Sequence, residues 1–139
     1  MTEFVSEEKI IPHSDVEVFR VLSDLQKLES VKHLVPEDKL SDFSFDADMV
    51  TFRFDPLGKV AFLVEEREPY KLIKFKSDKL GFDLFVSIHL EAESEKHTRL
   101  RLKLLADLNP FIKGMVEKPM GEALDKITDA LVQLPYDRL

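Results

Sequence analysis

Two hydrophobic periods divide this chain into regions with different expected structures. From Leu40 to Leu108, apolar side chains recur at every second position, as they do in strands that bury one face. Residues 14 to 35 and 109 to 134 instead carry apolar side chains at intervals of three and four, which is the period of an amphipathic helix. The pattern therefore predicts a sheet between two helical regions.

The N-terminal region is predicted to form one strand followed by a helix. Phe4 to Ile11 is extended in character and ends at Pro12. Ser14 and Glu17 have the spacing of a capping box, which satisfies free amides at the start of a helix. The expected buried face of this helix comprises Val18, Phe19, Val21, Leu22, Leu25 and Leu28.

A short second helical turn is predicted from Glu29 to Val35. Pro36 follows it, and proline cannot continue a helix because it lacks an amide hydrogen and its ring clashes with the preceding turn. We expect these two short helices to form one helical corner between the first strand and the rest of the sheet.

Six further strands are predicted, separated by turns that contain proline or glycine. Three turn signals are Asp55-Pro56-Leu57-Gly58, Glu68-Pro69 and Asp78-Lys79-Leu80-Gly81. The last two strands alternate most regularly and should pair as a hairpin across residues 94 to 97. Their apolar positions are Phe82, Leu84, Val86, Ile88 and Leu90 on one strand, and Leu100, Leu102, Leu104, Ala106 and Leu108 on the other.

A long C-terminal helix is predicted to cover the apolar face of this sheet. Asn109 is a favourable N-cap, and Pro110 occupies the first helical position, where its missing amide hydrogen costs nothing. A continuous apolar stripe then runs from Ile112 to Leu134, and Pro135 ends it. A helix of about 25 residues would be roughly 37 Å long, which is enough to cross the sheet.

The predicted order, together with the strand-to-helix junction from Ile10 to Phe19 and the following Leu22-Ser23-Asp24, resembles the START-like superfamily. This superfamily includes polyketide cyclases and dehydrases, lipid-transfer domains and plant pathogenesis-related allergens. The resemblance implies an α+β helix-grip fold in which a seven-stranded curved antiparallel sheet wraps a long C-terminal helix. Two short helices would lie between strands 1 and 2, and an apolar cavity would lie between sheet and long helix.

Composition narrows the domain organisation and the class of partner. A chain of 139 residues suits one domain, which we expect to span residues 1–139. The net charge of −7 disfavours binding to a nucleic-acid backbone. The absence of cysteine rules out disulfides and thiolate chemistry, and the first residues lack the pattern of a signal peptide, so we expect a cytoplasmic protein. No apolar run approaches the length of a membrane-spanning helix.

Phenylalanine is the residue type that most favours a ligand cavity, because the chain contains 11 phenylalanines and no tryptophan. A densely packed core would explain the same residues, so the two interpretations stay open. If a ligand binds, the expected contacts are Phe52, Phe54, Phe62, Phe75, Phe82, Leu84, Leu102, Phe111, Met115 and Met120.

The long helix also allows two interpretations. Gly114, Pro119 and Gly121 weaken its first half, and Met115 and Met120 are adaptable side chains. One hypothesis is that Pro119 kinks the helix over a ligand entrance. The other is that the proline only bends the helix around a curved sheet.

The sequence shows no catalytic, metal or cofactor motif. Ser87 and His89 should point outward from a strand, and residues two apart on a strand are separated by about 7 Å, too far for proton transfer. His89, Glu91, Glu93 and His97 could be considered as metal ligands, but their spacing matches no known metal-binding motif. Arg99, Arg101 and Lys103 form a basic stripe, which cross-strand pairs with Asp83, Glu91 and Glu93 would explain.

Three functions follow from these observations. The first is binding of a hydrophobic small molecule such as a lipid, an isoprenoid or a polycyclic compound, with Ser6, His13, Glu66, Glu68, Tyr70 and Ser77 as candidate polar groups near the cavity. The second is an enzyme resembling the polyketide cyclases, which would need His13, Glu66 or Tyr70 to point inward. The third is an interaction module with a filled core, in which Leu63, Phe85 and Leu105 on the outer sheet face contact a protein partner or a second copy.

Overall fold

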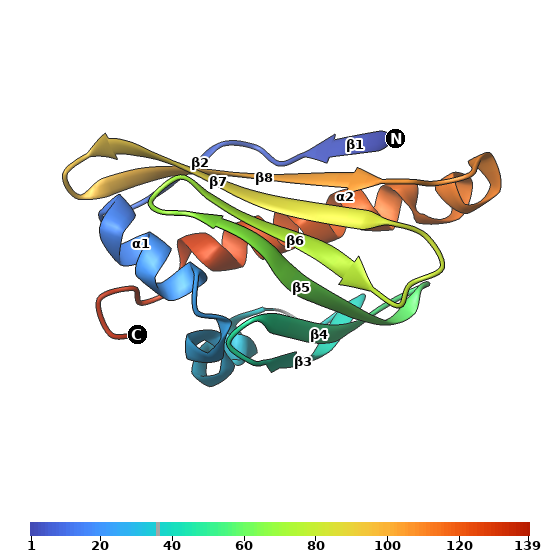
Figure 1. The fold of residues 1–139 in the computed structure, drawn as a ribbon, viewed down its shortest axis with the longest axis horizontal. Coiled ribbons are helices and arrows are strands. Elements are labelled where there is room, and N and C mark those ends of the chain that lie inside the picture. The colour runs from blue at the N-terminus through green and yellow to red at the C-terminus, as the bar shows by residue number, and fades with distance from the viewer. Residues whose placement is uncertain (36) are drawn as a thin grey trace.

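The computed structural model describes residues 1–35 and 37–139 and contains a curved sheet that wraps a long C-terminal helix (Figure 1). The strands are β1 (Thr2–Val5), β2 (Lys9–Ile11), β3 (Leu40–Phe45), β4 (Met49–Phe54), β5 (Gly58–Glu68), β6 (Leu72–Asp78), β7 (Leu84–Ser94) and β8 (His97–Ala106). The helices are α1 (Asp15–Leu22), the 3₁₀ helix η1 (Leu25–Leu34) and α2 (Pro110–Val132).

The sheet is antiparallel throughout and runs in the order β1-β8-β7-β6-β5-β4-β3, with β2 also paired to β8. Consecutive strands from β3 to β8 are therefore neighbours. The predicted order of elements and the helix-grip architecture are confirmed.

The predicted first strand forms two strands instead of one. Ser6 lies between β1 and β2, and its Oγ accepts a hydrogen bond of 2.9 Å from the amide of Leu102. The amide of Ser6 donates to the carbonyl of Leu102, also at 2.9 Å. Because the Ser6 side chain takes the place of a backbone acceptor, the ladder is interrupted while the chain stays bound to β8. The sheet is therefore eight-stranded, where the sequence predicted seven.

The helical corner lies where the sequence predicted it, but the boundary between its two helices falls at a different residue. Ser14 Oγ accepts from the amide of Glu17 at 3.2 Å, as the predicted N-cap requires. The helix α1 then ends at Leu22 and does not continue to Leu28. Asp24 caps a new 3₁₀ helix that begins at Leu25, and the predicted break at Pro36 lies outside the described residues.

The 3₁₀ geometry of η1 has a simple cause in the sequence. Its apolar residues recur at a spacing of three, and a 3₁₀ helix has three residues per turn, so they align on one face. These residues are Leu25, Leu28, Val31 and Leu34.

The predicted alternation in the sheet is confirmed, with small shifts at strand ends. The hairpin between β7 and β8 closes at Ser94 and His97, as expected. Phe82 precedes β7, which begins at Leu84. The concave face of the sheet is buried, and its core residues include Ile73, Leu100, Leu102 and Ala106.

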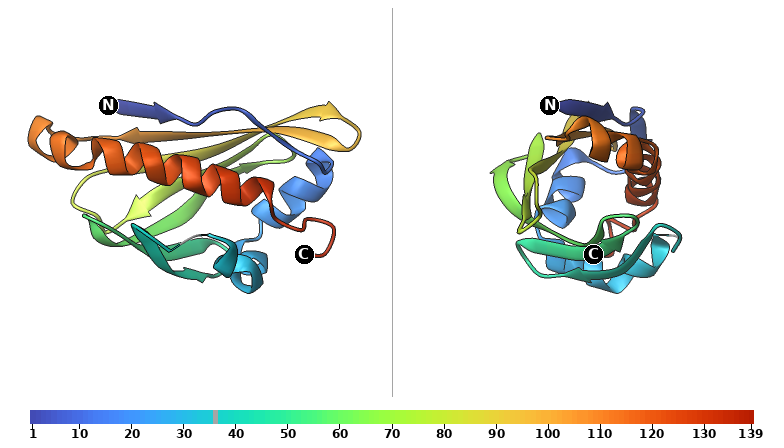
Figure 2. Two further views of the ribbon diagram at one scale, coloured as in Figure 1. Left: turned by 180° about the vertical axis from the view of Figure 1, so that it is seen from behind. Right: turned by 90° about the vertical axis from the view of Figure 1, so that its right-hand side faces the viewer.

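The helix α2 lies across the concave face of the sheet, with its C-terminal end near α1 (Figure 2). Asn109 Oδ1 accepts from the amide of Ile112 at 2.9 Å, and Pro110 is the first helical residue. The helix stays continuous through Pro119. Within the described residues, no helix is long and apolar enough to cross a bilayer.

Replacement of Ser14 by alanine tests the N-cap of α1. Removal of its hydroxyl leaves the Glu17 amide without its acceptor, so Ser14→Ala should lower the free energy of unfolding by about 1 kcal/mol. Urea denaturation measures this loss. The control Ser44→Ala removes an exposed hydroxyl on β3, and an equal loss in both variants would contradict a capping role for Ser14.

Candidate ligand-binding cavity

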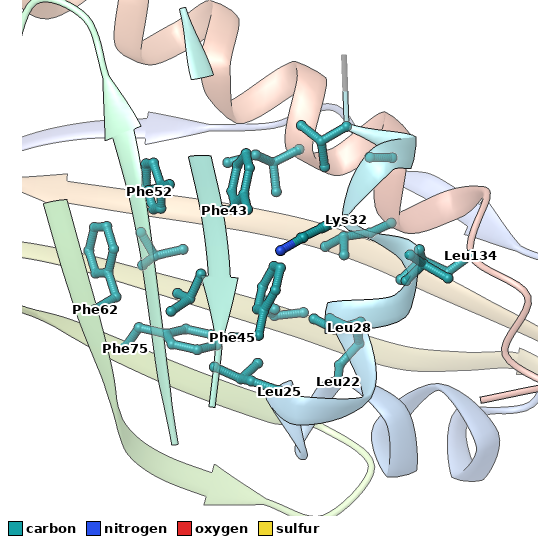
Figure 3. Close-up of a pocket in the computed structure, with 18 of the residues that line it drawn as sticks. Leu22, Leu25, Leu28, Lys32, Phe43, Phe45, Phe52, Phe62, Phe75 and Leu134 are labelled. Atoms are coloured by element: carbon teal, nitrogen blue, oxygen red, sulfur yellow. The ribbon is translucent and has the colours of Figure 1, made fainter. Parts of the chain in front are cut away.

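An apolar cavity of about 150 Å³ lies between the sheet, the helical corner and the C-terminal half of α2 (Figure 3). The helical corner contributes Leu22, Leu25, Leu28, Val31, Lys32 and Val35. The sheet contributes Phe43, Phe45, Val50, Phe52, Phe62, Phe75, Val86, Ile88 and Leu102. The remaining wall is formed by Ile127, Ala130, Leu131 and Leu134.

A second apolar cavity of about 80 Å³ adjoins the first, further along α2. The two cavities share five wall residues, namely Phe52, Phe62, Val86, Leu102 and Ile127. The rings of Phe52 and Phe62 are stacked with centroids 6.0 Å apart, and Phe43 stacks on Phe52 at 5.0 Å. The shared side chains therefore divide a larger space between sheet and helix into two parts.

Lys32 is the one charged side chain in the wall of the larger cavity among the described residues. Its Nζ donates to Oε1 of Glu29, one 3₁₀ turn earlier, and Glu29 Oε2 accepts from the amide of Phe45 on β3 at 2.9 Å. Hydrogen bonds from Lys32 and from this amide lower the pKa of the Glu29 carboxyl. The pair therefore joins η1 to the edge strand.

Solvent reaches Lys32, since 43% of its side chain is exposed. The same side chain lines the cavity, and in Figure 3 it points toward Phe43 and Phe45. Lys32 therefore marks the place where the cavity approaches the surface, between η1 and β3.

The structure divides the ten candidate contact residues into four groups. Phe52, Phe62 and Leu102 lie between the two cavities, and Phe75 lines the larger one. Phe54, Leu84 and Met120 line the smaller cavity. Phe82, Phe111 and Met115 line neither cavity. Phe111 is 81% exposed and Met115 is 51% exposed.

The larger cavity approaches the surface near the C-terminal half of α2. The hypothesised ligand entrance was at the N-terminal half of this helix. Gly114 and Met115 belong to the N-terminal half, whereas Ile127, Ala130 and Leu131 border the larger cavity. Met120 is buried against the smaller cavity. The closing element at the approach is η1.

The polar residues that the sequence placed near the cavity have other roles or positions. Ser6 Oγ accepts from the amide of Leu102 in the sheet, and Ser77 Oγ accepts from the amide of Leu84 at 3.0 Å. Nδ1 of His13 lies 3.7 Å from Oε2 of Glu17. Glu66, Glu68 and Tyr70 are exposed. None of these six lines either apolar cavity.

Ser87 and His89 are closer than the sequence argument allowed. Ser87 Oγ and His89 Nε2 lie 2.8 Å apart, so the expected separation of about 7 Å is wrong for the reacting atoms. That value describes the backbone, whereas the two side chains lean toward each other. Burial, with smaller effects of Lys103 and Arg101, lowers the pKa of His89. In the part of the chain that the structure describes, no carboxylate hydrogen-bonds to this imidazole, as a catalytic triad would require.

The basic stripe on the outer face forms ion pairs, and the predicted cross-strand pairing is confirmed for Arg99, which contacts Glu91 and Glu93 on β7. Arg101 pairs instead with Glu8, which lies between β1 and β2. Arg99 Nη2 lies 2.7 Å from Glu91 Oε1, and Arg101 Nη2 lies 3.1 Å from Glu8 Oε2. These pairs border an open, charged hollow of about 710 Å³ beside the β7–β8 hairpin. No group of acidic and histidine side chains within residues 1–35 and 37–139 is arranged to hold a metal ion.

Sequence reasoning missed the contribution of η1 and Lys32 to the site. It assigned Leu25 and Leu28 to the end of an α-helix, although the spacing of Leu25, Leu28, Val31 and Leu34 is the 3₁₀ signal. The polar residues expected near the cavity also lie on strands or beside them, and not on the short helix. The charged residue that reaches the cavity is Lys32, on the short helix η1.

No protein-family model matches the sequence, and no curated protein matches it. Solved structures do match. A START superfamily protein from Mycobacterium smegmatis aligns with a TM-score of 0.69 at 13% identity, over 94% of each chain. Norcoclaurine synthase from Thalictrum flavum, in complex with dopamine and hydroxybenzaldehyde, aligns with a TM-score of 0.70 at 14% identity, over 99% of this chain and 88% of that chain.

A protein from Thermus thermophilus aligns with a TM-score of 0.67 at 22% identity, over 95% of each chain. Identities at this level show a shared fold and leave the activity open. The chain therefore has the START-like helix-grip fold that its element order predicted.

Replacement of Phe52 tests the wall between the cavities. Phe52→Ala removes a buried ring that borders both spaces, so it should lower the free energy of unfolding by about 3–5 kcal/mol, as measured by urea denaturation. The control Phe85→Ala removes a ring from the half-exposed outer face and should cost clearly less. Equal losses would contradict the position of Phe52 in a buried wall between the two cavities.

Proposed function

We propose that this START-like helix-grip domain binds a small hydrophobic molecule in the space between its sheet and α2. The observation that carries the proposal is the wall of the larger cavity, which is apolar except for Lys32 at its surface end. A site of this composition gains affinity from burial of apolar ligand surface, and a single polar group sets the orientation.

The cavity size favours a ligand with one aromatic ring and a short chain that extends toward Lys32 at the surface end. A dry engineered cavity of about 150 Å³ accepts benzene, whereas sites for drug-sized ligands usually hold about 300–1,000 Å³. A longer lipid or a polycyclic compound would need the side chains of Phe52 and Phe62 to rotate, so that the two cavities join. We therefore propose Phe52, Phe62, Phe75 and Leu102 as the first ligand contacts, with Phe54, Leu84 and Met120 reached only by a longer ligand.

A shared fold gives independent support for a ring-sized ligand. The solved norcoclaurine synthase structure is a complex with dopamine and hydroxybenzaldehyde, each of which contains one aromatic ring. The fold can therefore accompany binding of molecules of this size.

The two other functions predict different results. A cyclase-like enzyme needs polar groups beside the bound molecule, but His13, Glu66 and Tyr70 line neither apolar cavity. An interaction module needs an exposed apolar surface, and Leu63 at 41% exposure is the most exposed of its three candidates. A chain that binds no small molecule would favour the interaction module.

Titration with 4-phenylbutanol tests the proposed site. Burial of roughly 200 Å² of apolar surface at about 25 cal/mol per Å² gives near 5 kcal/mol, which corresponds to a dissociation constant of about 0.1–1 mM. Isothermal titration calorimetry should detect saturable binding in this range. Val86→Phe, which places a ring in the wall shared by both cavities, should weaken binding at least tenfold by filling the space.

The matched control is Val5→Phe, which makes the same change at an exposed position of β1 and should bind as the original chain does. Thermal unfolding checks that both variants fold. Binding that survives Val86→Phe unchanged would place the ligand elsewhere, and absence of binding to the original chain would overturn the proposal.

A further inference from the structure

The larger cavity has one polar end, and this asymmetry restricts the kind of ligand that fits. Its described wall contains no hydroxyl, amide, carboxyl or imidazole side chain, and Lys32 supplies the one charge. A ligand hydroxyl or carbonyl buried deep against Phe62 and Phe75 would lose its hydrogen bonds to water without gaining a partner in the protein, which weakens binding. Polar groups of the ligand must therefore collect at the Lys32 end.

Lys32 has hydrogen-bonding capacity left for such a group. An ammonium carries three N–H donors, and the interaction with Glu29 Oε1 uses one of them. Glu29 is held in place from the other side, because its Oε2 accepts the amide hydrogen of Phe45. The ammonium is thus fixed at the mouth with two donors free to turn toward a bound molecule.

The sign of the charge decides which head group fits. A cationic head would be repelled by Lys32, and a neutral oxygen would gain an ordinary hydrogen bond. An anionic oxygen would gain a charge-assisted one, which is roughly twice as strong. Glu29 shares this ammonium and therefore opposes a second anion, while the amide of Phe45 stabilises part of the Glu29 charge.

We propose that the ligand is an amphipathic monoanion, such as an aryl or short-chain carboxylate, whose apolar body fills the larger cavity and whose carboxylate pairs with Lys32 between η1 and β3. This inference rests on the proposed binding function and adds the head group and the direction of entry. Glu29 then acts as an internal competitor that shares the ammonium with the ligand.

The test compares 4-phenylbutyrate with 4-phenylbutanol, which have the same apolar body and different head groups. Calorimetry on the original chain should show tighter binding of the carboxylate by about fivefold or more at low salt. Lys32→Met should abolish this preference while 4-phenylbutanol still binds. Lys27→Met changes a lysine on the same helix that lies outside the cavity wall, and it should preserve the preference.

Glu29→Gln should change the affinity for 4-phenylbutyrate in the opposite direction. This test does not require the Lys32 variant to fold. It frees the ammonium from its internal partner, so 4-phenylbutyrate should bind roughly two- to fivefold more tightly, while the binding of 4-phenylbutanol, which gains only an uncharged hydrogen bond, should change clearly less. Added salt should reduce the carboxylate preference, since the ion pair is partly exposed.

The outcomes separate this inference from the function on which it rests. If both molecules bind the original chain equally, or if Lys32→Met keeps the preference for the carboxylate, the assignment of the head group is overturned while cavity binding stands. If neither molecule binds, the proposed function fails and this inference fails with it.

Discussion

The structure depends on one geometric constraint, which is that a single helix cannot fill the concave face of a strongly curved sheet. Strands β3 to β8 present a continuous apolar face, and α2 is the one long element that crosses it. A single helix packed against a curved sheet leaves space beside it. The apolar cavities between Phe62, Leu102 and Ile127 are the consequence of this mismatch.

The helical corner closes the remaining space, and its tight geometry places a charge there. Because η1 is a 3₁₀ helix, side chains three residues apart lie above one another. Leu25, Leu28 and Val31 therefore face the cavity together, and Glu29 and Lys32 lie together at its margin. The hydrogen bond from the Phe45 amide to Glu29 fixes this helix against β3. The same short element thus supplies both the apolar lid and the polar mouth.

The sequence was sufficient for the parts of the fold that depend on long regular patterns. The hairpin of β7 and β8 and the start of α2 at Pro110 follow from alternation and from capping chemistry, which are local. The break between β1 and β2 arises because Ser6 Oγ replaces a backbone acceptor for the amide of Leu102 on β8. This contact joins residues far apart in the sequence, so no local pattern predicts it. The role of Lys32 depends on how η1 packs against β3, so no local pattern of its own identifies it.

In the proposed complex, the ligand binds in the space between the sheet and α2. Nuclear Overhauser contacts between bound 4-phenylbutyrate and the methyl groups of the protein locate the ligand. If the ligand binds there, contacts are expected from the aromatic ring to Leu102 and Leu131 and from the carboxylate end to Val31, beside Lys32. Contacts confined to outward-facing residues such as Leu63 and Leu105 would contradict it.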